Sequence, residues 1–280
     1  MDTRLAYETL SQILSYLKED QSALLQINRT CKKLHEVSLP LLFKTPKFES
    51  FSCFELFATT LTEANGLFVR HIDLHMVPHR WDSFKINNLL FTLSEKTPDL
   101  ELLNLDLCSQ LTNKALIKIT KPLHDLRILS VDQCELIGDE SIEALVNNCP
   151  YIQELYLGST HITDNSLNLI ATKFILLTHL HLPGCEYISE IGVDKVTSEC
   201  KTLRYIDLQD CYNVLGERTF QQGALFGDNT RPDIPLVFED DQWEDIDEDD
   251  GDGEEEEDEA EMEQNDEMWE DAPPAYRAIN

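Results

Sequence analysis

The chain has 280 residues, 42% of them hydrophobic and 27% charged, and its formal net charge is −31 at pH 7. A protein this acidic lacks the excess of lysine and arginine that neutralises phosphates, so its composition excludes typical nucleic-acid binding. No run of about 18 apolar residues could span a membrane, and the first residues lack the apolar core of a signal peptide. We therefore expect a cytoplasmic or nuclear protein with no membrane partner.

The acidic residues are concentrated at the end of the chain. Residues 239–280 contain 22 of the 53 acidic residues and one basic residue, Arg277, which gives this segment a charge of −21. The other residues contain 31 acidic and 21 basic side chains and carry −10. A segment with so little apolar content and so much self-repulsion does not order alone, so 239–280 is predicted to be a disordered acidic tail.

Taken in chain order, residues 5–43 show two apolar patterns with helical spacing. The first comprises Leu5, Leu10, Ile13, Leu14 and Leu17, and the second Leu24, Leu25, Ile27, Cys31 and Leu34. Two or three helices in about 40 residues form too small a core for comfortable independent stability. This segment should therefore pack on a partner or on the residues behind it.

Residues 46–66 contain apolar side chains three and four positions apart, which predict one helix: Phe51, Phe54, Phe57, Ala58 and Leu61. A strand-like pattern follows at Val69, Ile72 and Leu74. We interpret this region as an irregular first repeat of a longer array.

One pattern is then repeated five times. The first copy reads Leu100-x-x-Leu103-x-Leu105-x-x-Cys108-x-x-Leu111. The copies begin at Leu100, Leu126, Ile152, Leu177 and Leu203, which are 26, 26, 25 and 26 residues apart. This is the period of leucine-rich repeats, in which each unit is a short strand followed by a helix. Neither element can bury its apolar face alone, so the units must stack on one another.

The repeats predict an α/β fold: a right-handed solenoid with a parallel sheet on the concave face and helices on the convex face. Asn113, Asp139 and Asp164 stand where helix N-caps are expected. The solenoid should occupy residues 46–238 and contain about six repeats. Ile234, Leu236, Val237 and Phe238 are expected to form a C-terminal cap.

Eight cysteines raise the question of disulfides or metal. Cys108, Cys134, Cys185 and Cys211 share one repeat position, and they lack the closely spaced ligand pairs of a zinc site. We interpret them as small buried thiols that close the turn after each strand. No metal and no cofactor is predicted.

The side chains flanking the inward leucines should lie on the concave face and form a substrate-binding surface. They are Leu102, Asn104, Ile128, Tyr156, His179, His181 and Tyr205. We predict that Leu102, Ile128, Tyr156 and Tyr205 are exposed, because aromatic and aliphatic anchors dominate many protein contacts. The alternative is that scattered apolar residues on a sheet face have no partner.

The beginning of the chain resembles an F-box. Residues 5–17, Leu-Ala-Tyr-Glu-Thr-Leu-Ser-Gln-Ile-Leu-Ser-Tyr-Leu, are similar to its opening, and residues 30–34, Thr-Cys-Lys-Lys-Leu, match a later element approximately. Residues 39–44, Leu-Pro-Leu-Leu-Phe-Lys, are similar to the end of many fungal F-boxes, although Ala6 replaces the usual proline. The resemblance is to F-box proteins with cysteine-containing leucine-rich repeats, and it implies an F-box-like helical domain at 1–45.

This resemblance implies a substrate receptor of a cullin-type (SCF) ubiquitin ligase, which binds a Skp-family adaptor and a protein substrate. The implied adaptor contacts are Leu5, Leu10, Ile13, Leu14, Leu17, Leu24 and Leu25. No nucleophile–base motif and no phosphate-binding glycine loop is present, so we do not expect an enzyme. The alternatives are an acidic histone or basic-protein chaperone, a scaffold without ubiquitin chemistry, and helices that only cap the solenoid.

The last residues contain Pro273-Pro274-Ala275-Tyr276. Pro273, Pro274 and Tyr276 resemble a Pro-Pro-x-Tyr ligand of WW domains, which bind a polyproline helix in an aromatic groove. A WW-domain protein is therefore a further partner to consider, beside a chance occurrence of four residues.

Overall fold

The computed structural model describes residues 6–18, 20–78 and 84–214. The segment before the repeats folds as three helices, α1 (Tyr7–Ser15), α2 (Gln21–Asn28) and α3 (Lys32–Lys44). The Asp20 side chain caps α2 by accepting a hydrogen bond from the Ala23 N–H at 2.8 Å. Helix α3 packs on both α1 and α2. Leu5, the predicted C-terminal cap, the acidic tail and the Pro-Pro-Ala-Tyr motif lie outside the described residues.

The predicted helix within 46–66 is present as α4 (Phe51–Thr60), followed by the short α5 (Glu63–Gly66). Phe54, Phe57 and Ala58 on α4 are fully buried, as their spacing predicts. The Phe57 ring lies 5.2 Å from the Phe48 ring and 6.1 Å from the Phe43 ring at the end of α3. This aromatic cluster joins the leading helices to the first repeat.

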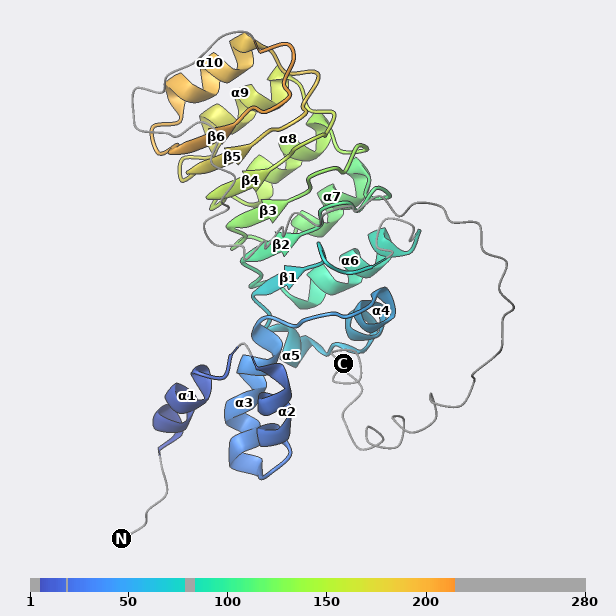
Figure 1. Ribbon diagram of the computed structural model, residues 1–280, viewed down its shortest axis with the longest axis vertical. Helices are drawn as coiled ribbons and strands as arrows, with labels where there is room; N and C mark the ends of the chain where they lie inside the picture. The colour runs from blue at the N-terminus through green and yellow to red at the C-terminus, as the bar shows by residue number, and fades with distance from the viewer. Residues whose placement is uncertain (1–5, 19, 79–83, 215–280) are drawn as a thin grey trace, which may run out of the picture. The chain divides into compact units, whose positions relative to one another are not determined.

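Six parallel strands form one sheet in which the spatial order is the chain order (Figure 1). They are β1 (His71–Asp73), β2 (Leu102–Asn104), β3 (Ile128–Ser130), β4 (Glu154–Tyr156), β5 (His179–His181) and β6 (Tyr205–Asp207). The central residues of the strands are buried and pair in register: Ile72, Leu103, Leu129, Leu155, Leu180 and Ile206.

One helix follows each of the first five strands, and the helices form a second layer along the sheet (Figure 1). They are α6 (Ile86–Lys96), α7 (Asn113–Thr120), α8 (Asp139–Asn148), α9 (Asp164–Lys173) and α10 (Glu190–Glu199). Each of these helices packs on the next one in the chain. The predicted α/β solenoid of strand–helix repeats is confirmed.

The turn after each of the strands β2 to β6 contains a residue in the left-handed conformation. Leu107, Gln133, Ser159, Gly184 and Asp210 have φ values of 62°, 59°, 51°, 66° and 58°. The N–H of this residue donates to a carbonyl of the next repeat, for example from Leu107 to Asp132 at 2.9 Å. The inter-repeat ladder therefore continues past the strands, although four of the five positions hold a side chain that disfavours this conformation.

The cysteines that follow these turns are buried, as predicted, and none of the eight cysteines, which all lie in the described ranges, forms a disulfide. The thiols of Cys134, Cys185 and Cys211 donate to the carbonyls of Leu105, Leu157 and Leu182 in the preceding repeat, at 3.2, 3.1 and 2.9 Å. Burial raises the pKa of Cys185 to about 12. These neutral thiols therefore contribute both packing and a hydrogen bond between repeats.

The prediction that Asn113, Asp139 and Asp164 are N-caps is wrong by one residue. The caps are Thr112, Gly138 and Thr163, and the three predicted residues begin the helices. Their side chains accept hydrogen bonds from the next repeat instead: Asn113 from the Gly138 N–H at 2.8 Å and Asp164 from the Ser189 N–H at 2.8 Å. A preceding threonine or glycine takes the cap position, which leaves these oxygens free to connect neighbouring repeats.

Candidate protein-binding surface

The open strand face is the side of the sheet formed by the first and third residues of each strand, since the second residue points to the buried side. The register places the predicted substrate-binding residues in two rows across this face. The first row is Leu102, Ile128, Glu154, His179 and Tyr205, and the second is Asn104, Ser130, Tyr156, His181 and Asp207. Six of the seven predicted residues therefore pair with another predicted residue on a neighbouring strand: Leu102 with Ile128, Tyr156 with His181, and His179 with Tyr205. The seventh, Asn104, pairs with Ser130.

Aromatic and histidine side chains from β4, β5 and β6 form one cluster. The Tyr156 and His181 rings are stacked with centroids 4.3 Å apart, and the Tyr205 ring lies 4.7 Å from His181. His179 is 5.9 Å from Tyr205. Because large planar side chains occupy equivalent positions on adjacent strands, the stacking follows from the register.

Two carboxylates are fixed within this cluster. The Tyr156 hydroxyl donates to Glu154 at 2.8 Å, and Asp207 Oδ2 lies 3.6 Å from His181 Nδ1. The hydrogen bond from His181 is the main cause of a lowered pKa at Asp207, and it outweighs the opposing effect of burial. Asp207 therefore stays ionised beside the histidine at neutral pH.

A second polar network covers the ends of β2 and β3. Asp106 accepts hydrogen bonds from the Ser130 hydroxyl and from the Asp132 N–H, the latter at 3.2 Å. Asp132 accepts from the Gly158 N–H at 2.6 Å. These carboxylates take part in linking successive repeats, so their presence on the face has a structural reason independent of any partner.

The predicted exposure of this face is wrong for Leu102, Tyr156 and Tyr205, which are only 8%, 0% and 9% exposed. Asn104 and His181 are also buried, whereas Ile128 and His179 are half-buried. Strands of one sheet are about 4.8 Å apart, so large side chains at equivalent positions cover one another. Alternation along a strand gave the correct face but could not show this mutual covering.

Exposed apolar side chains of the repeats occur in the loops at both edges of the sheet. Tyr151 and Ile175, in loops that lead into a strand, are 51% and 74% exposed. Others lie in the loops that leave the strands. Leu136, Tyr187 and Tyr212 are 50%, 55% and 76% exposed. Leu136 and Tyr187 directly precede the last apolar position of their repeat, Ile137 or Ile188. Because that apolar position can be recognised in the sequence, the residue directly before it could have been identified as a candidate exposed loop residue.

In the helical segment, the predicted adaptor contacts separate into two groups. Leu14, Leu24 and Leu25 are buried within the chain, at 5%, 0% and 6% exposure, which corrects their prediction as contacts open to an adaptor. Ile13 is 48% exposed, while Leu10 and Leu17 are half-buried. Tyr16, which the sequence did not single out, is the C-cap residue directly after α1 and is 83% exposed.

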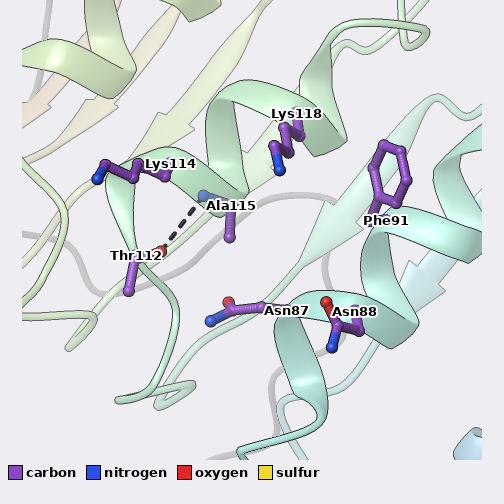
Figure 2. Close-up of a pocket in the computed structure, with 7 residues that line it drawn as sticks. All are labelled: Asn87, Asn88, Phe91, Thr112, Lys114, Ala115 and Lys118. Atoms are coloured by element: carbon purple, nitrogen blue, oxygen red, sulfur yellow. Dashed lines mark hydrogen bonds between the residues drawn. The ribbon is translucent and has the colours of Figure 1, made fainter.

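A small pocket lies between α6 and α7 (Figure 2). Its lining is Asn87, Asn88, Phe91, Thr112, Lys114, Ala115 and Lys118. The Thr112 hydroxyl caps α7 by accepting from the Ala115 N–H at 3.3 Å. The lining contains amides, a hydroxyl and two ammonium groups, so it provides hydrogen-bond donors and positive charge but no general base.

Among the residues that the structure describes, no cluster of three histidine, cysteine or acidic side chains has the arrangement of a metal site. None of the helices in the described ranges is both long enough and apolar enough to cross a bilayer.

No protein-family model matches the chain. A segment of 69 residues is 36% identical to the transport inhibitor response 1-like protein Os11g0515500 of Oryza sativa subsp. japonica. This segment is 25% of the present chain and 12% of the rice protein, so the chain matches only about an eighth of that relative.

Two solved structures are similar to the fold. The complex of Rad7 and Elc1 from yeast matches with a TM-score of 0.50 and 16% identity, covering 80% of this chain and 65% of the matched chain. A chain of the TLR13–ssRNA13 complex matches with a TM-score of 0.42 and 16% identity, over 56% of this chain and 22% of that chain. At such identities the likeness concerns the fold alone. With the repeat pattern and the six-stranded parallel sheet, the likeness to the Rad7–Elc1 structure shows that the chain has the fold of a leucine-rich-repeat solenoid.

Proposed function

We propose that this protein is the substrate-recognition subunit of a cullin-type ubiquitin ligase. In this proposal helices α1 to α3 bind a Skp-family adaptor and the repeats bind the protein substrate. The mechanism is proximity, because a substrate held beside the ligase meets the activated ubiquitin at a high effective concentration.

The observation that carries the proposal is an apolar surface on α1 in a segment whose sequence resembles an F-box. Ile13 is 48% exposed and Tyr16 is 83% exposed, and Tyr7 at the start of the same helix is 46% exposed. A helix that only capped the end of the solenoid would turn such side chains inward. Their exposure instead suits a helix that keeps part of its apolar surface for a partner.

Support from the comparisons is limited to the arrangement of parts. The matched yeast structure is a complex of Rad7 with a second protein, Elc1. By analogy, the repeats of the present chain would be one component of an assembly, and the adaptor another. The helical segment is the part to which we assign the adaptor, with Leu10, Ile13 and Leu17 as the contacts that remain accessible or half-accessible.

The test is a binding experiment with Ile13→Asp in the full-length protein and a purified Skp-family adaptor. A charge at this exposed position is compatible with the folded chain but would be buried without compensation in the complex. We expect the variant to lose adaptor binding in a pull-down and by calorimetry, and to melt at nearly the wild-type temperature.

Gln12→Asp is the matched control, since Gln12 is exposed on the same helix and the substitution adds the same charge. It should keep adaptor binding. Failure of the wild-type protein to bind a Skp-family adaptor, or equal loss in both variants, would contradict the proposal. Selective binding to Elc1 in its place would show that the helical segment binds a different class of partner.

A further inference from the structure

In the last four repeats, the two edges of the array differ in charge, a property that emerges only once the elements are placed. At one edge, the last four loops that leave a strand are residues 131–138, 157–163, 182–189 and 208–214. They contain no lysine or arginine and four acidic residues: Asp132, Glu135, Glu186 and Asp210. At the other edge, the loops 121–127, 149–153, 174–178 and 200–204 contain four basic residues and a single acidic residue, Asp125.

The first of these edges also exposes a row of apolar and aromatic side chains. Leu136, His161 and Tyr187 occupy the same position in successive repeats, directly before Ile137, Ile162 and Ile188. Leu136 is 50% exposed and Tyr187 is 55% exposed, and the His161 ring meets the Tyr187 ring edge-on with centroids 5.4 Å apart. With about 5 Å between repeats, these side chains form a continuous row.

Tyr212, in the last described repeat, is 76% exposed and lies one residue before the row position, which Asn213 occupies. Glu135 and Glu186 directly follow the repeat cysteines Cys134 and Cys185, and Tyr212 directly follows Cys211. Carboxylates and aromatic rings therefore lie on the same edge. We call Glu135, Leu136, His161, Glu186, Tyr187 and Tyr212 the acidic edge.

We propose that the acidic edge is the docking surface for a lysine- and arginine-rich segment of the substrate protein. Exposed carboxylates attract the basic groups and exclude acidic partners by repulsion. Tyrosine rings offer apolar contact area and attract cations over their faces. The protein's own residues 239–280 carry −21, the same sign as this edge, so charge complementarity favours a different, basic occupant.

The inference deepens the proposed function by naming the class of substrate, and it rests on the repeats being the substrate-binding part. The expected contact with the substrate moves from the open strand face, where most side chains are buried, to the adjoining loops. The inference does not depend on the identity of the adaptor.

The test measures binding of a labelled synthetic peptide of repeated Lys-Leu-Arg units to the full-length protein by fluorescence anisotropy. We expect the double substitution Glu135→Lys and Glu186→Lys to weaken binding by about tenfold, because two attractions become repulsions. The uncharged pair Tyr187→Ala and Tyr212→Ala should weaken it by at least about threefold.

The control pair is Asp125→Lys and Glu143→Lys, which changes the net charge by the same amount at two exposed positions away from the acidic edge. It should alter affinity by less than about twofold. Because every variant keeps residues 239–280, any contribution of that segment is the same in all of them. Thermal melting establishes that each variant is folded.

Equal weakening by both charge-reversal pairs would show that the peptide responds only to net charge and would overturn the proposal. So would unchanged binding in the variant lacking Tyr187 and Tyr212. Adaptor binding, measured in the same variants, should stay at the wild-type level. A wild-type protein that binds the peptide at this edge but no adaptor would refute the ligase proposal alone.

Discussion

Asp139 illustrates how single side chains join the repeats. Its carboxylate accepts hydrogen bonds from the Thr163 N–H at 2.9 Å, from the Thr163 hydroxyl at 2.6 Å, and from the Ser166 hydroxyl. Burial by itself would raise the pKa of Asp139, but the hydrogen bonds from Ser166 and Thr163 prevail and leave the pKa below its ordinary value. The ionised form is thus the one that holds the third and fourth repeats together.

We predict that Asp139→Ala lowers the free energy of unfolding by about 1–3 kcal/mol, because three donors of the next repeat lose their acceptor. Glu143→Ala, on the exposed side of the same helix, should change it by less than about 0.5 kcal/mol. Denaturant titrations of the two variants measure both values. A cost at Asp139 no larger than that at Glu143 would mean that the connection contributes nothing to stability.

The same prediction has a dependence on pH. A carboxyl whose pKa is lower in the folded than in the unfolded state stabilises the fold above the unfolded pKa, and this contribution is lost as the pH falls through the folded pKa. The difference between wild type and Asp139→Ala should therefore be full at neutral pH and shrink below about pH 4. A difference independent of pH would assign the effect to packing.

At the scale of elements, every strand has three residues and most helices of the repeats have 8–10. Isolated elements of this length are not stable in water. Their stability comes from the contact of each repeat with the next, through the buried leucines, the cysteine thiols and the carboxylates at the helix starts. Close approach between elements is therefore a requirement of the fold.

The approach is closest for backbone atoms at Gly66, the last residue of α5. A Cβ added there would lie 2.0 Å from the carbonyl oxygen of Lys96, the last residue of α6. We predict that Gly66→Ala destabilises the protein by about 1–3 kcal/mol, because a carbonyl of the backbone must move. The melting temperature measures the effect, with Ala64→Ser on the exposed side of α5 as a neutral control. An unchanged melting temperature in Gly66→Ala would show that the contact relaxes freely.

At the scale of the whole molecule, charge is distributed unevenly. Residues 239–280 carry −21 and the remainder carries −10, and the two loop edges of the last four repeats have opposite signs. If residues 239–280 associate with basic proteins, we expect the association to weaken with salt, since exposed charges are screened within about 10 Å at 0.1 M.

We predict that deletion of residues 239–280 leaves the melting temperature nearly unchanged and adaptor binding intact. The composition of this segment gives it few apolar groups with which to contribute to a core. Weak association with basic proteins should decrease, and added salt should have the same effect in the full-length chain. A large drop in melting temperature would show that the segment packs on the repeats. Tyr276→Ala tests the proposed WW-domain ligand separately.

The sequence by itself determined the repeats, because their leucine and cysteine positions follow a fixed period and each position has one physical role. It determined the strand face correctly from alternation, and the burial of the cysteines from their shared position. Side-chain spacing along one element is a local property, and the sequence contains it completely.

The tertiary structure decided what depends on neighbouring repeats. Tyr156 and Tyr205 lie on the predicted face but are buried, because side chains on adjacent strands stack. Asp139 has the sequence position expected of a helix N-cap, but its carboxylate accepts a hydrogen bond from Thr163 in the next repeat. This contact forms only when the repeats stack. Glu135 and Glu186 are 51 residues apart in the chain and gather on one edge for the same reason. Contacts between repeats are set by the register of stacking, which no single copy of the pattern specifies.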